Sequence, residues 1–299
     1  ELSKLNDVKE EILSPHHFGI PQHRSRFYIV GRLKEKGGLQ DFKFPEKEEK
    51  DNISIHNIII PDDDDFMTLR ENTKNHLVVW QEFLNNLKPE EVPRFPIWAM
   101  EFGADYPFEN KAPVNLSVKE LKNKKGTFGT LIQGNSFDDM LDCLPTYARD
   151  GVKVGQTEFP HWKKYYIRAN REFYQKHKEW LDQWIPKIVE FENSHQKFEW
   201  NCGDKGNLTI EDKIVQFRPS GIRVKQPTYS PALVLTTTQI PIFPWLGRYM
   251  TRKEAAKLQC MEELAELPPT IAKAFRALGN AVNVGVVKKI AINLIREYE

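Results

Sequence analysis

Cysteine is scarce in this sequence, which contains only Cys143, Cys202 and Cys260. The three lie far apart, with no Cys-x-x-Cys pair and no histidine at the spacing of a zinc ligand. This pattern argues against a disulfide framework and a zinc site, and we expect no bound metal. Sparse, odd-numbered cysteines are typical of reduced thiols in a cytoplasm.

Long hydrophobic runs are also lacking. No apolar stretch approaches the roughly 20 residues that cross a bilayer, and the charged opening "ELSKLNDVKEEIL" does not resemble a signal peptide. These absences predict a cytoplasmic protein with no membrane partner. The chain begins with Glu rather than Met, which predicts that it was cut from a longer polypeptide. Its 299 residues are enough for two domains, each with its own core.

The net charge is only +1, so the chain as a whole has no strong charge bias. One region, however, is strongly basic. Residues 216–258 contain a single acid, Glu254, and seven basic residues: Arg218, Arg223, Lys225, Arg248, Arg252, Lys253 and Lys257. Such a local surplus predicts a polyanionic partner. The strand-like stretch "SPALVLTTTQIP" lies within it. Its hydroxyl and amide groups suit hydrogen bonds to DNA, although a threonine-rich strand in a sheet is the alternative: Thr236, Thr237, Thr238 and Gln239.

The stretch "FGIPQHRSRFYIVG", residues 18–31, is more specific. After a Gly-x-Pro turn, Gln22, Arg24 and Arg26 occupy alternate positions ahead of an apolar strand at 27–31. Alternate residues of a strand point to the same face, so this spacing predicts that the amide and the two guanidinium groups act together.

Two helices are predicted in the middle of the chain, over residues 67–88 and 163–185, the second ending at Pro186. The aromatic stripe of the second helix indicates a core position. Its basic residues form either a solvated face or a track for DNA phosphates, and they include Lys163, Lys164 and Arg168. Short strands are predicted in "NISIHNIII", and the aromatic-rich "FPIWAMEFGADYPF" predicts the local core of a loop-rich domain.

Three helices are predicted at the carboxyl end. Thr251 and Glu254 have the spacing of a capping box at the start of the first. Pro268 and Pro269 are predicted to open the second, and Gly279 to end it. In the third, apolar residues recur on one face: Val284, Val287, Ala291 and Leu294.

Together, three segments resemble the carboxyl-terminal half of the DNA (cytosine-5) methyltransferases. "FGIPQHRSRFYIVG" is similar to the family motif Gly-x-Pro-Gln-x-Arg-x-Arg, "RYMTRKEAAKLQCM" to Arg-x-Leu-Thr-x-Arg-Glu-x-Ala-Arg-Leu-Gln-Gly, and "GNAVNVGVV" to Gly-Asn-Ser/Ala-Val. They occur in the family's order, with a long variable segment after the first. Cys260 replaces the common glycine of the second motif, which predicts different backbone angles there.

The resemblance implies a function for each segment. One arginine of the first motif would hydrogen-bond O2 of a flipped cytosine and neighbouring catalytic groups, so Arg24 and Arg26 take this role and Gln22 supports them. Asn280, Ala281 and Val282 would line the amino-acid end of S-adenosylmethionine. The recognition segment would contact duplex DNA through the basic and hydroxyl residues already named: Arg218, Arg223, Lys225, Thr236, Thr237, Thr238, Gln239, Lys163, Lys164 and Arg168.

Several family elements are missing from the sequence. No proline precedes a cysteine, no Glu-Asn-Val occurs and no Phe-x-Gly-x-Gly follows a strand. We therefore expect a carboxyl-terminal part of a methyltransferase, or one subunit of a split enzyme, that is inactive alone. The missing amino-terminal half, covalent or separate, would bind most of the S-adenosylmethionine. Without that half, we expect the apolar faces of the last helices to be exposed or covered by a neighbour.

These inferences predict an α/β fold with a partial, Rossmann-like S-adenosylmethionine-dependent methyltransferase domain and a mixed, loop-rich target-recognition domain. We assign the catalytic part to residues 1–33 and 248–299, and DNA recognition to residues 34–247. The partner would be duplex DNA in the cytoplasm of a bacterium with a restriction–modification system, including a cognate restriction endonuclease. A non-catalytic, sequence-specific DNA-binding module, or the DNA-recognition subunit of a split methyltransferase, is the alternative.

Overall fold

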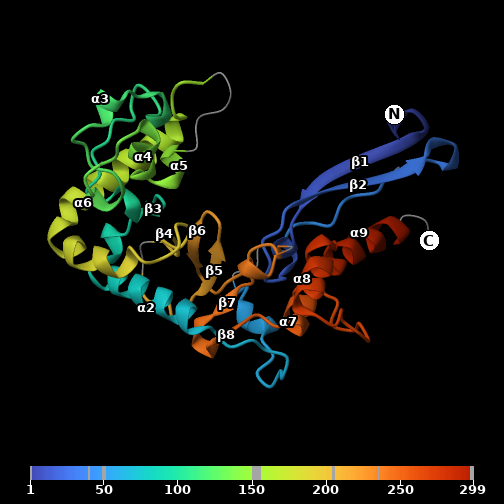
Figure 1. Cartoon of the computed structure of the whole chain (residues 1–299). Helices are drawn as coiled ribbons and strands as arrows, with labels where there is room; N and C mark the ends of the chain where they lie inside the picture. Colours follow the sequence, from blue (N-terminus) through green and yellow to red (C-terminus); the bar gives the residue numbers. More distant parts are fainter. Residues whose placement is uncertain are drawn as a thin grey trace. The chain divides into compact units, whose positions relative to one another are not determined.

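The computed structural model describes residues 2–39, 41–48, 52–149, 156–203, 206–234 and 236–296 (Figure 1). The chain divides into two compact units. Unit 1 comprises Glu1–Leu69, Glu211–Gln216 and Gln226–Glu299, and unit 2 comprises Arg70–Ile210 and Phe217–Lys225. Segments from the two ends of the sequence thus share unit 1, which also contains residues 34–69 and 226–247. The assignment of a recognition function to residues 34–247 stays a prediction.

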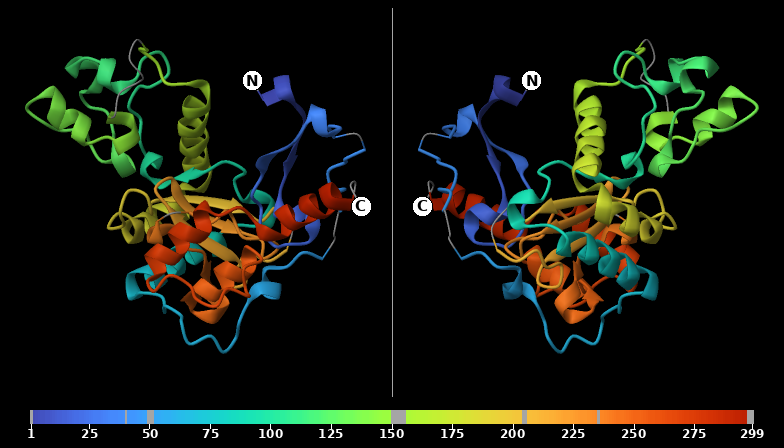
Figure 2. Two further views of the ribbon diagram at one scale, coloured as in Figure 1. Left: turned by 90° about the vertical axis from the view of Figure 1, so that its right-hand side faces the viewer. Right: turned by 90° about the vertical axis from the view of Figure 1, so that its left-hand side faces the viewer.

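Unit 1 opens with α1 (Leu2–Leu5) and a β-hairpin of β1 (Asn6–Leu13) and β2 (Arg26–Leu33). The strands pair antiparallel, with Leu13 opposite Arg26 and Glu11 opposite Tyr28. Helix α9 (Val284–Arg296) lies along the hairpin (Figures 1 and 2). Strand, loop and helix share one core, made of Leu13, Phe18, Val30, Leu39, Phe42, Val286 and Ile290.

The opposite face of the hairpin is apolar and open. Ile12 pairs with Phe27, and Ile29 follows two residues later on the same face. Their exposed fractions are 57%, 56% and 51%, and Val284 and Val287 of α9 are each 39% exposed. The expected exposure of apolar residues on the last helix is confirmed. A strand with apolar residues on both faces is typical of a sheet that is covered on both sides.

The first predicted helix of the carboxyl end is α7 (Arg252–Leu258), and its capping box is confirmed: Thr251 Oγ1 accepts from the Glu254 amide at 3.1 Å. The predicted ends of the second helix were wrong. Helix α8 spans Ile271–Asn280, because the Thr270 side chain accepts from the Lys273 amide and so caps the helix two residues after the prolines. Gly279 remains within α8.

Residues 271–295 are long and apolar enough, by length and composition alone, to cross a membrane, with a mean hydropathy of 1.2. Our reading of the sequence missed this run. In the structure it is not one continuous helix, because the chain leaves the helical conformation between Asn280 and Val284. The side chains of Phe275, Leu278 and Val286 are buried in unit 1.

Three further strands contribute residues to unit 1. Strand β5 (Ile214–Arg218) begins there, and its Val215 pairs with Ile242 of β7 (Ile242–Phe243). Strand β7 in turn pairs antiparallel with β8 (Arg248–Tyr249). The strands predicted in "NISIHNIII" and "SPALVLTTTQIP" were wrong. The first is a 3-10 turn at Ile55–Ile58 and the second is irregular with a 3-10 turn at Thr237–Gln239. Prolines at both ends of the second stretch remove backbone donors that a strand would need.

Unit 2 combines helices with a small mixed sheet. Strand β3 (Ile97–Trp98) pairs antiparallel with β4 (Lys197–Asn201), which pairs parallel with β6 (Gly221–Lys225). The helices are α2 (Glu71–Asn85), α3 (Val118–Leu121), α4 (Phe137–Asp142), α5 (Thr146–Arg149) and α6 (His161–Ile188). The predicted α/β class is confirmed.

Helix α6 is longer than the predicted 163–185. Pro186 lies inside its last turn rather than after it, because a proline so near the end removes only one hydrogen bond of the helix. His177 leaves the helical conformation (φ −117°, ψ 19°) and kinks the helix. The predicted core of 95–108 is confirmed: buried residues there include Ile97, Trp98, Met100, Phe102, Tyr106 and Phe108.

Candidate active site

The segment that carries Gln22 and Arg24 is fixed on two sides by backbone hydrogen bonds. Gly19 has a φ of +79° and ends the 3-10 turn Pro15–Phe18, which directs the chain toward β2. Gln22 forms a parallel bridge with Ser230, in which the Ser230 amide donates to the Pro21 carbonyl at 2.8 Å. The Arg24 amide donates to Ser14 Oγ at 2.9 Å. The backbone at both residues is therefore held in place by unit 1 itself.

The Arg24 guanidinium is 5% exposed and only partly bonded. Its Nη2 donates to the Gly279 carbonyl at 2.6 Å, whereas Nε and Nη1 have no hydrogen-bond partner in the part of the chain that the structure describes. Burial lowers the pKa of Arg24, and the charge of Arg26 lowers it further. Since arginine stays protonated in proteins, the site contains a buried cation with two unused donors.

Gln22 is buried more completely than Arg24, and its side chain has fewer hydrogen bonds. Its side chain is fully buried, and neither Oε1 nor Nε2 has a hydrogen-bond partner among the described residues. A buried amide without partners is destabilising by about 1–3 kcal/mol per group. Such groups occur in native proteins mainly where a ligand supplies the partners, so Gln22 and Arg24 together indicate a polar site for a bound group.

Arg26 differs from the other two residues of its motif. Strand β2 begins at Arg26, so Gln22 and Arg24 precede the strand, and the prediction of one continuous strand face was wrong. The Arg26 side chain is exposed and donates to the Ser25 carbonyl. Arg26 and Arg24 both act on the neighbouring Tyr28, so Arg26 remains close to the site. Burial raises the pKa of Tyr28, and the charges of the two arginines lower it.

The turn between α8 and α9 carries the three predicted cofactor residues. Asn280 and Val282 are exposed and Ala281 is half-buried. Two amides that the sequence analysis did not single out hold this turn. Asn283 Nδ2 donates to the Leu258 carbonyl at 3.0 Å, and Gln259 Nε2 donates to the Leu278 carbonyl at 3.0 Å. The sequence offers no local signal of this role for Gln259, which lies in the charged motif "RYMTRKEAAKLQCM", whereas Asn283 stands out in the mostly apolar "GNAVNVGVV".

Cys260 lies next to this turn, and its φ of +55° is in the left-handed region. The cysteine thus adopts a conformation that favours glycine, and the comparison of its angles with those of the family's glycine stays a prediction. A Cβ placed on Gly285 would come within 2.9 Å of Cys260 Sγ and of Ile20 Cδ1, so this glycine allows α9 to approach closely. Burial raises the pKa of the Cys260 thiol, which disfavours its thiolate form.

The second motif is organised by a buried ion pair. Arg248 Nη2 and Nη1 donate to Glu254 Oε1 and Oε2 at 2.7 and 2.9 Å. Glu254 also accepts from the amides of Ile60 and Thr251 at 3.0 and 2.9 Å. Its four hydrogen bonds satisfy the buried carboxylate, so this glutamate is a structural centre of unit 1.

Most predicted DNA-binding residues of unit 2 already have partners. Arg218 Nη2 and Arg223 Nε both donate to Glu199 Oε2, at 2.8 and 2.6 Å. Lys164 pairs with Glu158 at 2.7 Å, and Arg168 pairs with Glu109 through two guanidinium nitrogens. Lys163 donates to the Tyr147 carbonyl and lies over the Phe159 ring. Burial lowers the pKa of Lys225, and Arg223 lowers it further.

The predicted threonine-rich segment belongs to unit 1. Thr236 and Thr238 are exposed, and the Gln239 carbonyl accepts from Gln216 Nε2 at 2.8 Å. The side chain of Thr237 lies outside the described part. The segment therefore presents hydroxyl groups to solvent from a turn that is anchored by Gln239.

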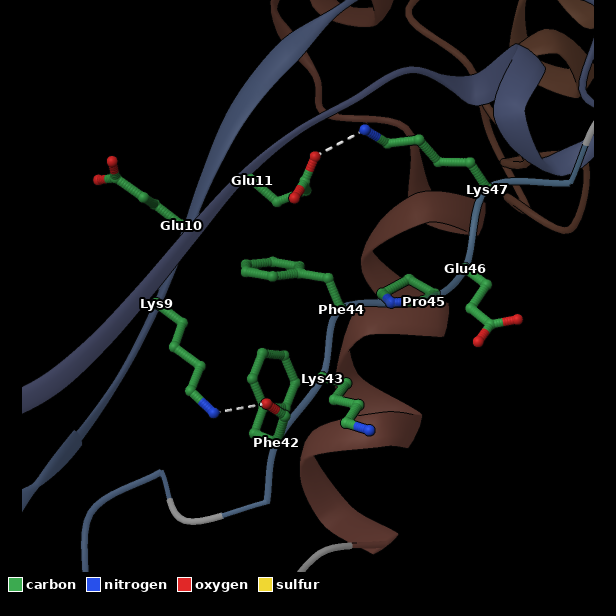
Figure 3. A pocket seen from close by; sticks show the side chains of 9 residues that line it. All are labelled: Lys9, Glu10, Glu11, Phe42, Lys43, Phe44, Pro45, Glu46 and Lys47. Atoms are coloured by element: carbon green, nitrogen blue, oxygen red, sulfur yellow. Dashed lines mark hydrogen bonds and ion pairs between the residues drawn. The ribbon is translucent and has the colours of Figure 1, made fainter.

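A prominent hollow of unit 1 lies away from the candidate site. It has a volume of 710 Å³ and lies in unit 1 between β1 and residues 42–47 (Figure 3). Two of its lysines form the bonds that Figure 3 shows: Lys47 pairs with Glu11 at 2.6 Å and Lys9 donates to the Phe42 carbonyl at 2.7 Å. It is shallow and open, whereas the unsatisfied groups of Gln22 and Arg24 are buried.

Comparison with known proteins supports the family resemblance of these motifs. The model of a family described as C-5 cytosine-specific DNA methylase matches residues 5–296. The type II methyltransferase M.AluI of Cellulosimicrobium cellulans is 38% identical over 142 residues, which are 46% of this chain and 27% of that protein. The chain thus spans about a quarter of the length of this relative.

Proposed function

Because the chain belongs to the C-5 cytosine-specific DNA methylase family, we propose that Gln22 and Arg24 receive a cytosine that has been flipped out of duplex DNA. The observation that carries this proposal is the set of four buried side-chain atoms without partners: Gln22 Oε1, Gln22 Nε2, Arg24 Nε and Arg24 Nη1. The Watson–Crick edge of cytosine contains a carbonyl, a ring nitrogen and an amino group, which match these donors and this acceptor.

In this proposal, Arg24 Nη1 donates to the cytosine O2 while Nη2 remains on the Gly279 carbonyl, and Nε, on the other side of the guanidinium from Nη1, is left for a different acceptor. The fixed fork of the guanidinium positions the base, and its charge stabilises negative charge that develops on the ring during attack at C6. Arg26, at the exposed start of β2, supports the same site from its rim. S-adenosylmethionine supplies the methyl group to C5. Asn280, Ala281 and Val282 fit one wall of its site, since the turn offers an amide side chain and accessible backbone.

The catalytic thiol is not assigned to any cysteine of residues 1–299. None is preceded by proline, and the Cys260 thiol is held in its neutral form by burial. We propose that the nucleophile, the protonating glutamic acid and the main S-adenosylmethionine loop come from further polypeptide, covalent or separate, and that residues 1–299 alone do not transfer methyl groups. The open face of the hairpin, with Ile12, Phe27 and Ile29 exposed, offers a surface for this polypeptide. The family match, which extends over nearly the whole chain, leaves the carboxyl-terminal assignment unconfirmed.

Recognition of duplex DNA is proposed for the basic residues of unit 2 and the hydroxyl groups of unit 1. Arg218 and Arg223 share the single carboxylate of Glu199, so one positive charge is left for a phosphate. Thr236, Thr237, Thr238 and Gln239 would add hydrogen bonds. The similarity to a type II methyltransferase supports a bacterial, cytoplasmic restriction–modification system with a cognate endonuclease.

The test compares two arginine variants of unit 1. In protein assembled with the polypeptide that carries the Pro-Cys nucleophile, we expect Arg24→Ala to slow methyl transfer roughly 100-fold, the typical effect of losing one preorganised donor. Its affinity for duplex DNA should remain within about threefold of the wild type, because Arg24 acts only after the base is flipped. Arg276→Ala, which removes an exposed arginine of α8, is the matched control. Equal losses of rate and affinity in Arg24→Ala would contradict the proposal.

The alternative, a DNA-binding module without catalysis, is tested by the same reagents. Under that alternative, no added polypeptide restores methyl transfer, and Arg24→Ala changes neither activity nor affinity. Methyl transfer by residues 1–299 alone would instead refute the proposed need for a second polypeptide.

A further inference from the structure

Two large aromatic side chains at the start of α6 are exposed to solvent. Trp162 is 56% exposed and Tyr165 is 52% exposed. Their spacing of three residues places them next to each other on one face of the helix. Exposed apolar surface of this size is unfavourable in water and marks a binding surface when it is clustered.

These two rings, here called the aromatic pair, rest on an aromatic cluster. Tyr166 contacts both, with ring centroids 5.7 Å from Trp162 and 5.7 Å from Tyr165. Trp98 lies beneath, 5.5 Å from Tyr166 and 4.4 Å from Tyr147. Trp98 is 7% exposed. The aromatic pair is therefore supported by a rigid base and does not belong to the core.

The surroundings of the aromatic pair are cationic. The Lys197 ammonium lies over the rings of Tyr147 and Trp98, at 4.9 and 5.7 Å from their centroids. Burial lowers the pKa of Lys197, and no carboxylate contacts its ammonium among the residues that the structure describes. Arg168, six residues after Trp162 on the same helix, is half exposed and paired with Glu109. Protein contacts to duplex DNA go largely to its sugars and phosphates, which exposed aromatic side chains beside a cation suit.

We propose that the aromatic pair is a DNA-contact site of unit 2, at which the rings of Trp162 and Tyr165 pack against the sugars of the DNA backbone while Lys197 contacts a nearby phosphate. This inference rests on the proposed function, since it takes duplex DNA as the partner. The proposed DNA contact on α6 is thus made by Trp162 and Tyr165 and not by Lys163 and Lys164. Lys163 donates to the Tyr147 carbonyl, and Lys164 is paired with Glu158. The rings and not these lysines are the accessible part of the helix.

The test measures binding of residues 1–299 to a mixed-sequence duplex of about 30 base pairs by fluorescence anisotropy at several salt concentrations. We expect Trp162→Ala and Tyr165→Ala each to weaken binding about tenfold, because burial of a half-exposed aromatic ring contributes about 1.4 kcal/mol, with an unchanged salt slope because no charge is removed. Trp162→Phe should recover most of the affinity. Lys197→Gln should weaken binding and lower the salt slope by about one phosphate contact.

Val78→Ser is the matched control, because Val78 is a 56% exposed apolar residue on α2 of the same unit. It should bind like the wild type. If Trp162→Ala and Tyr165→Ala also bind like the wild type, the inference is overturned while the proposed function stands. If they bind normally but reduce self-association, the aromatic pair is a protein interface and the inference is equally overturned. If the wild type binds no duplex, the proposed function fails first.

Discussion

His76 gives unit 2 a predictable sensitivity to acid. Its side chain is 3% exposed, lies 4.0 Å from the Phe191 ring and 4.7 Å from His195, and has no partner for Nδ1 within the described ranges. Burial, with a smaller contribution from the charge of His195, lowers the pKa of His76 to about 4. In the unfolded chain its pKa is near 6.5.

The unfolded state therefore binds a proton more readily than the folded state, and stability falls as the pH drops from about 6.5 to about 4. At 1.36 kcal/mol per pKa unit, a difference of roughly 2.5 units amounts to about 3 kcal/mol once both states are protonated. At pH 5 about 2 kcal/mol is already lost. His195, whose pKa burial also lowers, adds to the effect in the same direction.

The measurement is urea unfolding followed by tryptophan fluorescence at pH 7.5, 6, 5 and 4.5. We expect His76→Phe to lose about 2–3 kcal/mol less than the wild type between the first and last pH, whatever its stability at pH 7.5. His161→Asn, which changes an exposed histidine of the same unit, should follow the wild-type curve. Parallel curves for wild type and His76→Phe would refute the reasoning.

Two further substitutions test other buried groups by urea unfolding. Glu101→Ala should destabilise unit 2 by about 3–5 kcal/mol, because it leaves Arg171 buried without its carboxylate at 2.9 Å, whereas Glu109→Ala breaks only the exposed pair with Arg168 and should change stability by less than about 1 kcal/mol. Similar effects of both would argue against a buried ion pair. Cys260→Val should lower stability by about 1–3 kcal/mol because a β-branched residue is strained at positive φ, while Cys260→Gly should be close to neutral. A glycine variant less stable than the valine variant would contradict the strain.

The sequence could predict those elements whose signals are local. The capping box at Thr251, the strand after Arg26 and the aromatic core of 95–108 depend on neighbours within a few residues, and they appear as expected. The extent of α6 and the irregular 230–241 segment depend on contacts far along the chain. The Gln239 carbonyl, for example, is bound by Gln216, and no local pattern reveals that partner.

The candidate site was accessible to sequence reasoning only in part. The motif pointed to Gln22 and Arg24, but their burial, and the exposure of Arg26, follow from where β2 begins. The hydrogen bond from Arg24 to Gly279 joins residues that are 255 positions apart. Likewise, the ion pairs of Lys164 and Arg168 required the positions of Glu158 and Glu109, which only the fold determines.

That single bond from Arg24 to the Gly279 carbonyl has a consequence for how the protein can vary. Residues 70–210 all belong to unit 2, so the chain that separates the two bonded residues can lengthen, shorten or be exchanged as a cassette without altering either end of the bond. A backbone carbonyl is the acceptor, so replacing the side chain at residue 279 would not by itself remove it. Chimaeras that exchange residues 70–210 together with 217–225 should therefore retain the Arg24–Gly279 hydrogen bond, and under the proposed function they should differ in the DNA that they select.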